Sequence, residues 1–189
     1  MPLSPPATRK PIHKRQIECH GFLRDDGLWD IEGRLTDTKS YDFTNEWRGE
    51  MAAGTPVHDM WLRLTVDDQY TIHEVEAVTD SSPYNICPEI TENFQHLVGL
   101  SMVRGFKRKM TEALGGIKGC THLGELAGRL ATVAFQTIRP HLREAERKGE
   151  SYPKLKPGTR PVVLNTCHAW DEKGEVVKRW FPDFYTGPE

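Results

Sequence analysis

The feature that most constrains this chain is an alternation of apolar and polar residues over two neighbouring stretches, VHDMWLRLTV at 57–66 and YTIHEVEAVT at 70–79. This two-residue period is typical of β-strands with one buried face. The apolar face of the first stretch consists of Met60, Leu62, Leu64 and Val66. Asp67 and Asp68 supply turn residues between the two stretches. The pattern predicts an antiparallel hairpin.

Other segments extend this prediction to an α+β domain. RQIECHGFLR at 15–24 and LWDIEGRLTD at 28–37 flank the turn Asp25-Asp26-Gly27 and predict a hairpin before the first one, with a loop at 39–55 between the two. Helical periodicity predicts helices at 88–98, 104–114 and 123–138, the last reaching Pro140 and followed by a continuation or a second short helix. PVVLNTCHAW at 161–170 and EVVKRWF at 175–181 predict a C-terminal hairpin. We therefore expect an antiparallel sheet of two to three hairpins packed by about three helices.

Length and charge limit the organisation and the partners. A chain of 189 residues favours one main domain, and we expect an extended proline-rich arm at 1–13, an α+β domain at 14–150, and a connector and hairpin at 151–189 packed on that domain. A net charge of -2 gives no general attraction to nucleic acid or to an anionic membrane. Without an apolar run that could span a bilayer or a signal core, a cytoplasmic location is expected, and exposed strand edges together with the arm favour a homodimer.

The candidate site lies at the starts of two predicted helices. Cys87 precedes Pro88, and Cys120-Thr121-His122 follows a glycine-rich turn and opens the helix at 123–138. A thiol at a helix N-terminus has a lowered pKa and is therefore more nucleophilic. The same residues also fit a plain structural interpretation, in which the cysteines fill the core and Thr121 or His122 caps the helix.

Five further residues join the candidate site. His58 and Asp59 are a polar pair at the start of a strand that otherwise alternates, although a pair facing water would look the same. Tyr84 could donate a proton to a substrate oxygen or cover the edge of the core. Trp29 could form one wall of a pocket for an aromatic ligand, and Arg104 could meet an anionic group or serve as part of a solubilising face.

The order of these elements resembles the iron-sulfur scaffold (IscU/SufU-like) fold, on the stretches HDMWLRLTVDDQYTIHEVEAVTD, PYNICPEITENFQHLVG and IKGCTHLGELAGRLATVAF. That resemblance implies that the two helix starts meet in space. His58 stands nearest the scaffold's first cysteine, Cys87 falls several residues after its second, and Gly119-Cys120 replaces its His-Cys pair. The whole chain resembles a proteobacterial family known only as a domain of unknown function, on RQIECHGFLRDDGLWDIEG, HDMWLRLTVD and GCTHL. This second resemblance implies a role in the catabolism of aromatic and other hard carbon sources.

No nucleotide-binding, α/β-hydrolase or zincin motif is present in the sequence. Together with the catabolic role that the second resemblance implies, this leads to the hypothesis of a small catabolic lyase without an organic cofactor. It would cleave a carbon-carbon bond of an aromatic or lignin-derived substrate in retro-aldol fashion and release formaldehyde. His122 or His58 would take the proton, Asp59 would assist, Tyr84 would polarise the substrate oxygen, and Cys120 would stabilise negative charge; Thr121, Cys87, Trp29 and Arg104 would bind the substrate. The alternative is a zinc, iron or iron-sulfur scaffold with Cys87, Cys120, His122 and His58 as ligands. A third hypothesis is an assembly or regulatory subunit whose proline-rich arm docks to a catalytic partner.

Overall fold

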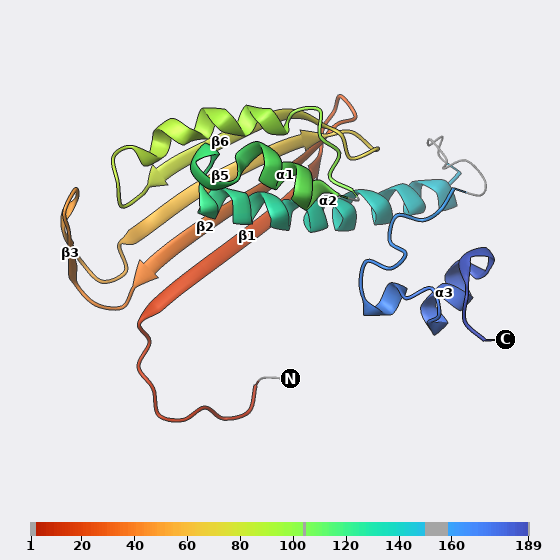
Figure 1. Cartoon of the computed structure of the whole chain (residues 1–189), viewed down its shortest axis with the longest axis horizontal. Helices are drawn as coiled ribbons and strands as arrows, with labels where there is room; N and C mark the ends of the chain where they lie inside the picture. Colours follow the sequence, from red (N-terminus) through yellow and green to blue (C-terminus); the bar gives the residue numbers. More distant parts are fainter. Residues whose placement is uncertain (1–2, 104, 150–158, 189) are drawn as a thin grey trace. The chain divides into compact units, whose positions relative to one another are not determined.

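The computed structural model describes residues 3–103, 105–149 and 159–188. Its main feature is an antiparallel sheet of four strands in the order β1-β2-β5-β6, and a short two-stranded sheet and several helices complete the α+β architecture (Figure 1). The four strands are β1 (His13–Leu23), β2 (Trp29–Lys39), β5 (Pro56–Val66) and β6 (Ile72–Ser81). Both predicted hairpins are therefore confirmed, with β1 paired to β2 and β5 paired to β6.

One face of the sheet forms the core, because the two-residue period of the strands sends every second side chain toward the helices. Its fully buried apolar side chains include Ile31, Leu35, Leu62 and Leu64. Helices η1, α1 and α2 lie over one face of the sheet (Figure 1). The opposite face carries polar side chains joined by ion pairs, such as those of Arg63 with Glu32 and Glu76.

The predicted loop at 39–55 contains a small hairpin of its own, made of β3 (Phe43–Asn45) and β4 (Gly49–Met51). Its turn is fixed by the Asn45 side chain, which accepts hydrogen bonds from the backbone N–H groups of Trp47 and Arg48, both at 2.9 Å. Gly49 completes the turn with a φ of 73°, a left-handed conformation that glycine adopts readily. The segment is thus an ordered element at one end of the main sheet (Figure 1).

The first predicted helix is a 3-10 helix, η1 (Cys87–Leu97). Three residues per turn bring Phe94 and Leu97 to the same buried side. Val98, the last residue of the predicted helix at 88–98, lies just after η1 ends and is exposed. An α-helical period would have placed Val98 on the same face as Phe94, but the tighter 3-10 geometry does not.

The remaining helices of the main region are α1 (Phe106–Leu114), η2 (Gly116–Lys118) and α2 (Thr121–Arg147). α2 is the predicted long helix, and its side chains from Leu123 to Ile138 at helical spacing are buried. It continues through Pro140 instead of ending there, so the helical continuation was the right alternative. No helix in the described ranges is long and apolar enough to cross a membrane.

The chain divides into two compact units, Met1–His141 and Leu142–Glu189. In the second unit the described residues form η3 (His168–Trp170), α3 (Glu175–Trp180) and η4 (Pro182–Phe184). The predicted C-terminal hairpin at 161–181 was wrong. Gly174 is extended and Glu175 opens a helical turn, where an acidic side chain is favoured by the helix dipole. The predicted packing of residues 151–189 on the main domain stays a prediction, and most of the expected connector, up to residue 158, lies outside the described residues.

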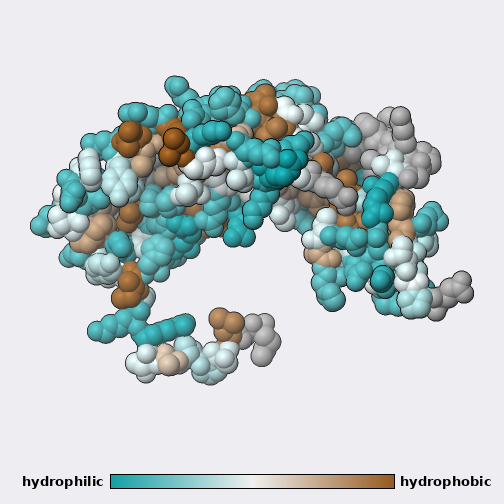
Figure 2. All heavy atoms as spheres, viewed as in Figure 1, coloured by the Kyte–Doolittle hydropathy of each residue, from teal (hydrophilic) through white to brown (hydrophobic). Residues whose placement is uncertain are grey.

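The N-terminal arm is extended and exposed from residue 3 up to the start of β1 at His13. Figure 2 shows one face of the molecule, on which hydrophilic side chains predominate and hydrophobic ones form separate spots.

Candidate functional site

Three strands bring a row of polar side chains to the helix-covered face at one end of the sheet. Asp37, near the end of β2, lies directly opposite Arg15 on β1 and His58 on β5. These residues lie at positions whose side chains point toward the core. The carboxylate of Asp37 therefore occupies a position where the alternation of β2 predicts an apolar side chain. A register irregularity in the β2–β5 pairing follows directly after Asp37, and such irregularities often re-aim side chains beside sites.

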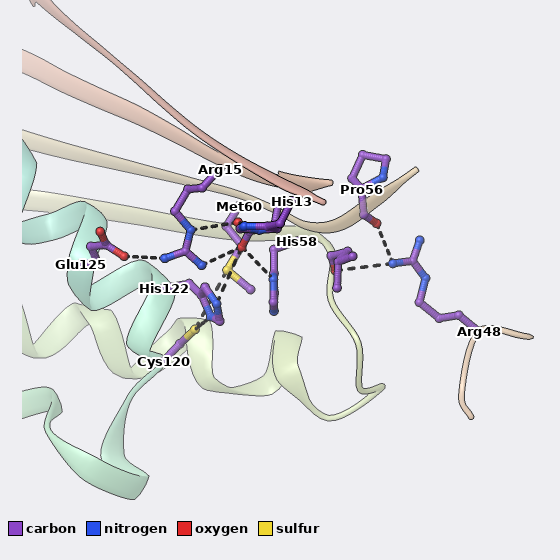
Figure 3. Close-up of polar contacts among 11 residues, drawn as sticks. His13, Arg15, Arg48, Pro56, His58, Met60, Cys120, His122 and Glu125 are labelled. Atoms are coloured by element: carbon purple, nitrogen blue, oxygen red, sulfur yellow. Dashed lines mark hydrogen bonds and ion pairs between the residues drawn. The ribbon is translucent and has the colours of Figure 1, made fainter. Parts of the chain in front are cut away.

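Asp37 is the centre of this cluster and accepts four hydrogen bonds, from the side chains of His13, Arg15 and His58 that Figure 3 labels. Oδ1 accepts from Arg15 Nε at 2.9 Å and from His13 Nε2 at 2.8 Å, while Oδ2 accepts from Arg15 Nη2 at 2.7 Å and from His58 Nδ1 at 3.0 Å. A carboxylate has about four lone-pair positions, so the hydrogen-bonding capacity of Asp37 is fully used. Arg15 also donates to Glu125 on α2 at 2.7 Å, which ties the sheet to the helix.

The charge state of Asp37 fixes the proton position on His58. Burial alone would raise the pKa of Asp37, whose side chain is only 4% exposed, but the hydrogen bonds and charge of Arg15 and the hydrogen bond from His13 outweigh it and lower the pKa to about 2. Asp37 is therefore ionised at neutral pH and accepts hydrogen bonds only. His58 must then carry a proton on Nδ1, and in the neutral ring this leaves a free lone pair on Nε2.

His58 and His122 face each other, with ring centroids 3.8 Å apart. Burial lowers the pKa of His58, and the neighbouring charge of a protonated His122 would lower it further. Burial also lowers the pKa of His122, followed by the positive charge of Arg15. Both rings are thus neutral near pH 7, and their side chains keep exposures of 15% and 24%, so part of each reaches solvent.

Cys120 and Thr121 stand at the start of α2. The sulfur of Cys120 lies 3.9 Å from His122 Nδ1 and 4.0 Å from Met60 Sδ, which are weak contacts for a thiol. Beside it is a cavity of about 160 Å³, lined by Cys120, Thr121 and residues of the α1–α2 connection that include Gly115, Gly116 and Gly119. The glycine-rich turn therefore does leave open space next to the thiol.

Among the described residues, Asp37, His58 and His122 are the group whose possible metal-ligand atoms all lie within 4.8 Å of one another. The saturated Asp37 is a poor member of this set, because a metal would have to displace Arg15 or a histidine from it. The guanidinium group of Arg15 would also repel a dication at that position. Neutral histidine nitrogens suit zinc or iron, but neither Cys87 nor Cys120 is part of the group, and the sulfur of Cys120 lies 3.9 Å from His122 Nδ1.

Several residues predicted for the site lie elsewhere. Asp59 points to the opposite face of the sheet, where it pairs with Arg34 at 2.8 and 2.7 Å. Trp29 is buried at the other end of β2, edge-to-face with His141, and at about 3.3 Å per residue it lies roughly 26 Å from Asp37. Neither residue lies beside Asp37, because the two-residue period sends Asp59 to the other face of the sheet and Trp29 stands at the far end of the strand. Arg104 lies outside the described residues.

Tyr84 and Cys87 lie on the segment that follows β6. Cys87 is half-buried at the first residue of η1, and its N–H donates to the carbonyl of Tyr84 at 3.2 Å. Tyr84 is exposed and packs edge-to-face on Trp47 of the β3–β4 hairpin, with ring centroids 5.1 Å apart. The structure therefore brings His58, His122 and Cys120 together, and it pairs Tyr84 with a different partner.

Sequence reasoning did not include His13, Arg15, Asp37 or Glu125 in the site. One signal was available, because Asp37 continues the alternation of Ile31, Gly33 and Leu35 and so occupies a position of the buried face. Glu125 had no comparable signal, since an acidic residue in an early turn of a helix is ordinary.

Comparison with known proteins gives a family for this fold and site. Residues 13–136 match the family described as "Protein of unknown function (DUF2889)". The chain belongs to this family. The matched range includes all four strands of the main sheet and every residue of the Asp37 cluster. No curated protein and no solved structure matches the chain, and the DUF2889 description names no reaction.

Proposed function

We propose that this DUF2889 protein is an acid-base lyase that cleaves a carbon-carbon bond in retro-aldol fashion. The observation that carries the proposal is the hydrogen bond from His58 Nδ1 to the ionised Asp37, at 3.0 Å. It leaves His58 Nε2 as a neutral base, and the carboxylate stabilises the imidazolium ion that forms when the base takes a proton. This is the arrangement by which an aspartate orients a catalytic histidine in other enzymes.

The proposed step acts on a substrate with a hydroxymethyl group next to a carbon that can carry negative charge. His58 Nε2 takes the proton of the hydroxyl group, the oxygen forms a carbonyl, and the carbon-carbon bond breaks with its electron pair left on the larger fragment. That fragment then takes the proton back, so the products are formaldehyde and the shortened substrate. Atoms and charge balance without an oxidant, a reductant or an organic cofactor.

Other residues would assist this step. His122, stacked on His58, would return the proton or hold it in transit. Cys120 and the backbone N–H groups of the first turn of α2 would face the developing negative charge. We place Tyr84 at the substrate oxygen, because its hydroxyl group has no hydrogen-bond partner within the described ranges.

The substrate proposed is an aromatic, lignin-derived compound. Its support is the resemblance to a catabolic family together with the exposed aromatic side chains of Trp47 and Tyr84 at the same end of the sheet as His58.

The test is formaldehyde release from a panel of phenolic compounds that carry a hydroxymethyl group next to an activated carbon. We expect release with the wild-type protein, loss of at least about 100-fold with His58→Gln, and little change with Asp59→Asn, the matched variant on the opposite face. Release that survives in His58→Gln, or no release from any member of the panel, would refute the lyase.

A second candidate function is metal binding, which the closeness of Asp37, His58 and His122 favours. In this alternative, Asp37, His58 and His122 would hold a zinc or iron ion, which could act as a Lewis acid on a substrate oxygen. Anaerobic purification followed by metal and sulfide analysis decides between the two. Stoichiometric metal that is lost in His122→Gln would support a metal centre and contradict the metal-free lyase.

A further inference from the structure

Arg48 stands out from the other cations at the site's end of the sheet. Its Nη1 donates to the backbone carbonyl of Pro56 at 2.8 Å and to that of Val57 at 3.5 Å (Figure 3). Those two residues directly precede His58 on β5. Arg48 is therefore held beside the strand that carries the proposed base.

The charge of Arg48 is not neutralised. Arg15 is paired with Asp37 and Glu125, and Arg34 is paired with Asp59. Within the described ranges no carboxylate forms an ion pair with Arg48, although Glu46 and Glu50 flank it in the chain. Among the residues that the structure describes, its hydrogen bonds use Nη1 alone and leave the other donors of the guanidinium group without a partner.

Two exposed aromatic side chains form a pair that includes the residue directly before Arg48. Trp47 is 53% exposed and meets Tyr84, which is 50% exposed, at 5.1 Å between ring centroids. Asn45 fixes the backbone of Trp47 and Arg48, and the backbone carbonyl of Tyr84 accepts a hydrogen bond from Ser82 Oγ at 3.0 Å. A ring pair and a guanidinium group carried by neighbouring residues of one turn offer partners for a flat ring with a carboxylate attached.

We propose that Trp47, Tyr84 and Arg48 form a subsite for an aromatic carboxylate, with the ring against the Trp47–Tyr84 pair and the carboxylate on Arg48. This inference rests on the proposed function in one respect: the subsite would deliver an aromatic acid to His58. Substrate specificity would come from the charge as well as the ring, since a carboxylate gains charge-assisted hydrogen bonds that a neutral analogue does not.

The experiment uses three probes of matched shape. 3-Phenylpropanoate has both ring and charge, 3-phenylpropanamide lacks the charge, and 3-cyclohexylpropanoate lacks the aromatic ring. Each is titrated into the full-length protein while the indole N–H signal of Trp47, assigned with Trp47→Phe, is followed by NMR. We expect saturable binding of 3-phenylpropanoate, with affinity at least about tenfold above that for either of the other two probes.

Variants then test whether Arg48 is the residue that binds the carboxylate. Arg48→Met should lower the affinity for 3-phenylpropanoate to that for the amide and leave the amide unchanged, and Arg48→Lys should keep part of the difference. Arg34→Met is the matched control, because Arg34 also lies beside a tryptophan, at 4.7 Å from the Trp61 ring, but on the opposite face. Equal affinities for acid and amide in the wild-type protein, an unchanged affinity in Arg48→Met, or the absence of saturable binding would overturn the subsite. The wild-type comparison holds even if Arg48→Met does not fold.

The subsite and the lyase can fail separately. Probe binding requires no turnover, so His58→Gln should bind 3-phenylpropanoate as the wild-type protein does. Binding of 3-phenylpropanoate without any formaldehyde release would support the subsite and refute the lyase. Formaldehyde release from neutral substrates without binding of 3-phenylpropanoate would support the lyase and refute the subsite.

Discussion

Replacing Asp37 by asparagine tests the centre of the cluster, because this carboxylate accepts hydrogen bonds from Arg15, His13 and His58 at once. Its pKa falls from 3.8 to about 2 in the folded protein, and at about 1.4 kcal/mol per unit this corresponds to about 2 kcal/mol of folding free energy. Asparagine also leaves Arg15 without one of its two carboxylate partners. We therefore expect a loss of about 2 to 4 kcal/mol at pH 7.

The stabilising effect of Asp37 should decrease as the pH falls. A carboxyl group with a lowered folded-state pKa stabilises the protein above its unfolded pKa, here 3.8, and loses that contribution as the pH falls through about 2. The difference between wild type and Asp37→Asn should therefore shrink by about 2 kcal/mol between pH 7 and pH 2. Urea unfolding followed by circular dichroism at both pH values measures the difference.

Asp59→Asn is the matched control, because Asp59 also binds an arginine through two hydrogen bonds but contacts no histidine. Arg34 is 42% exposed, so we expect a smaller loss of about 1 kcal/mol. A difference below about 0.5 kcal/mol for Asp37→Asn at pH 7, or one that is the same at pH 7 and pH 2, would refute the electrostatic account of Asp37.

Four further predictions follow from the fold and the site. Gly33→Ala should destabilise by about 1 to 3 kcal/mol, because its Cβ would lie 2.7 Å from a Leu126 methyl group, whereas Gly128→Ala, with open space on α2, should stabilise by about 0.5 to 1 kcal/mol in the same urea assay. The lowered pKa values of His58 and His122 predict that stability falls as the pH drops below the unfolded value of 6.5; a pH series in which His58→Gln loses as much as the wild type would contradict this. Cys120→Ala should slow formaldehyde release by no more than about tenfold, since its sulfur makes only weak contacts, and a loss as large as that of His58→Gln would reassign the base. We also expect a homodimer through β1, an edge strand without a bulge in its pairing to β2; light scattering that shows a monomer at all concentrations would rule it out.

The sheet could be predicted because its signal is local. The alternation of Met60, Leu62, Leu64 and Val66 reports a strand with one buried face, and that face is buried in the structure. The helical period of α2 is equally local, although Pro140 did not end the helix. In the C-terminal segment, by contrast, the apolar runs are short and fit a strand and a helical turn equally well. The spacing of apolar residues therefore could not distinguish the helix α3 (Glu175–Trp180) from a strand.

The site could be predicted only in part, because it depends on pairing between distant residues. His58, Cys120 and His122 were found from helix starts and from a polar break in a strand. Asp37 lies in the same sheet, but its role follows from the register that sets it opposite Arg15 and His58. Sequence patterns give the period of a strand, whereas register against a neighbour is fixed by the whole sheet.

The proton position on His58 tests the central claim most directly and needs no substrate. Long-range proton-nitrogen NMR on protein with labelled histidine distinguishes a nitrogen that carries a proton from one with a free lone pair. At pH 7 we predict a neutral His58 with its proton on Nδ1 and a free Nε2, and loss of this single form in Asp37→Asn. A protonated ring at pH 7, or a proton on Nε2 with Nδ1 free, would contradict the assignment of His58 as the base.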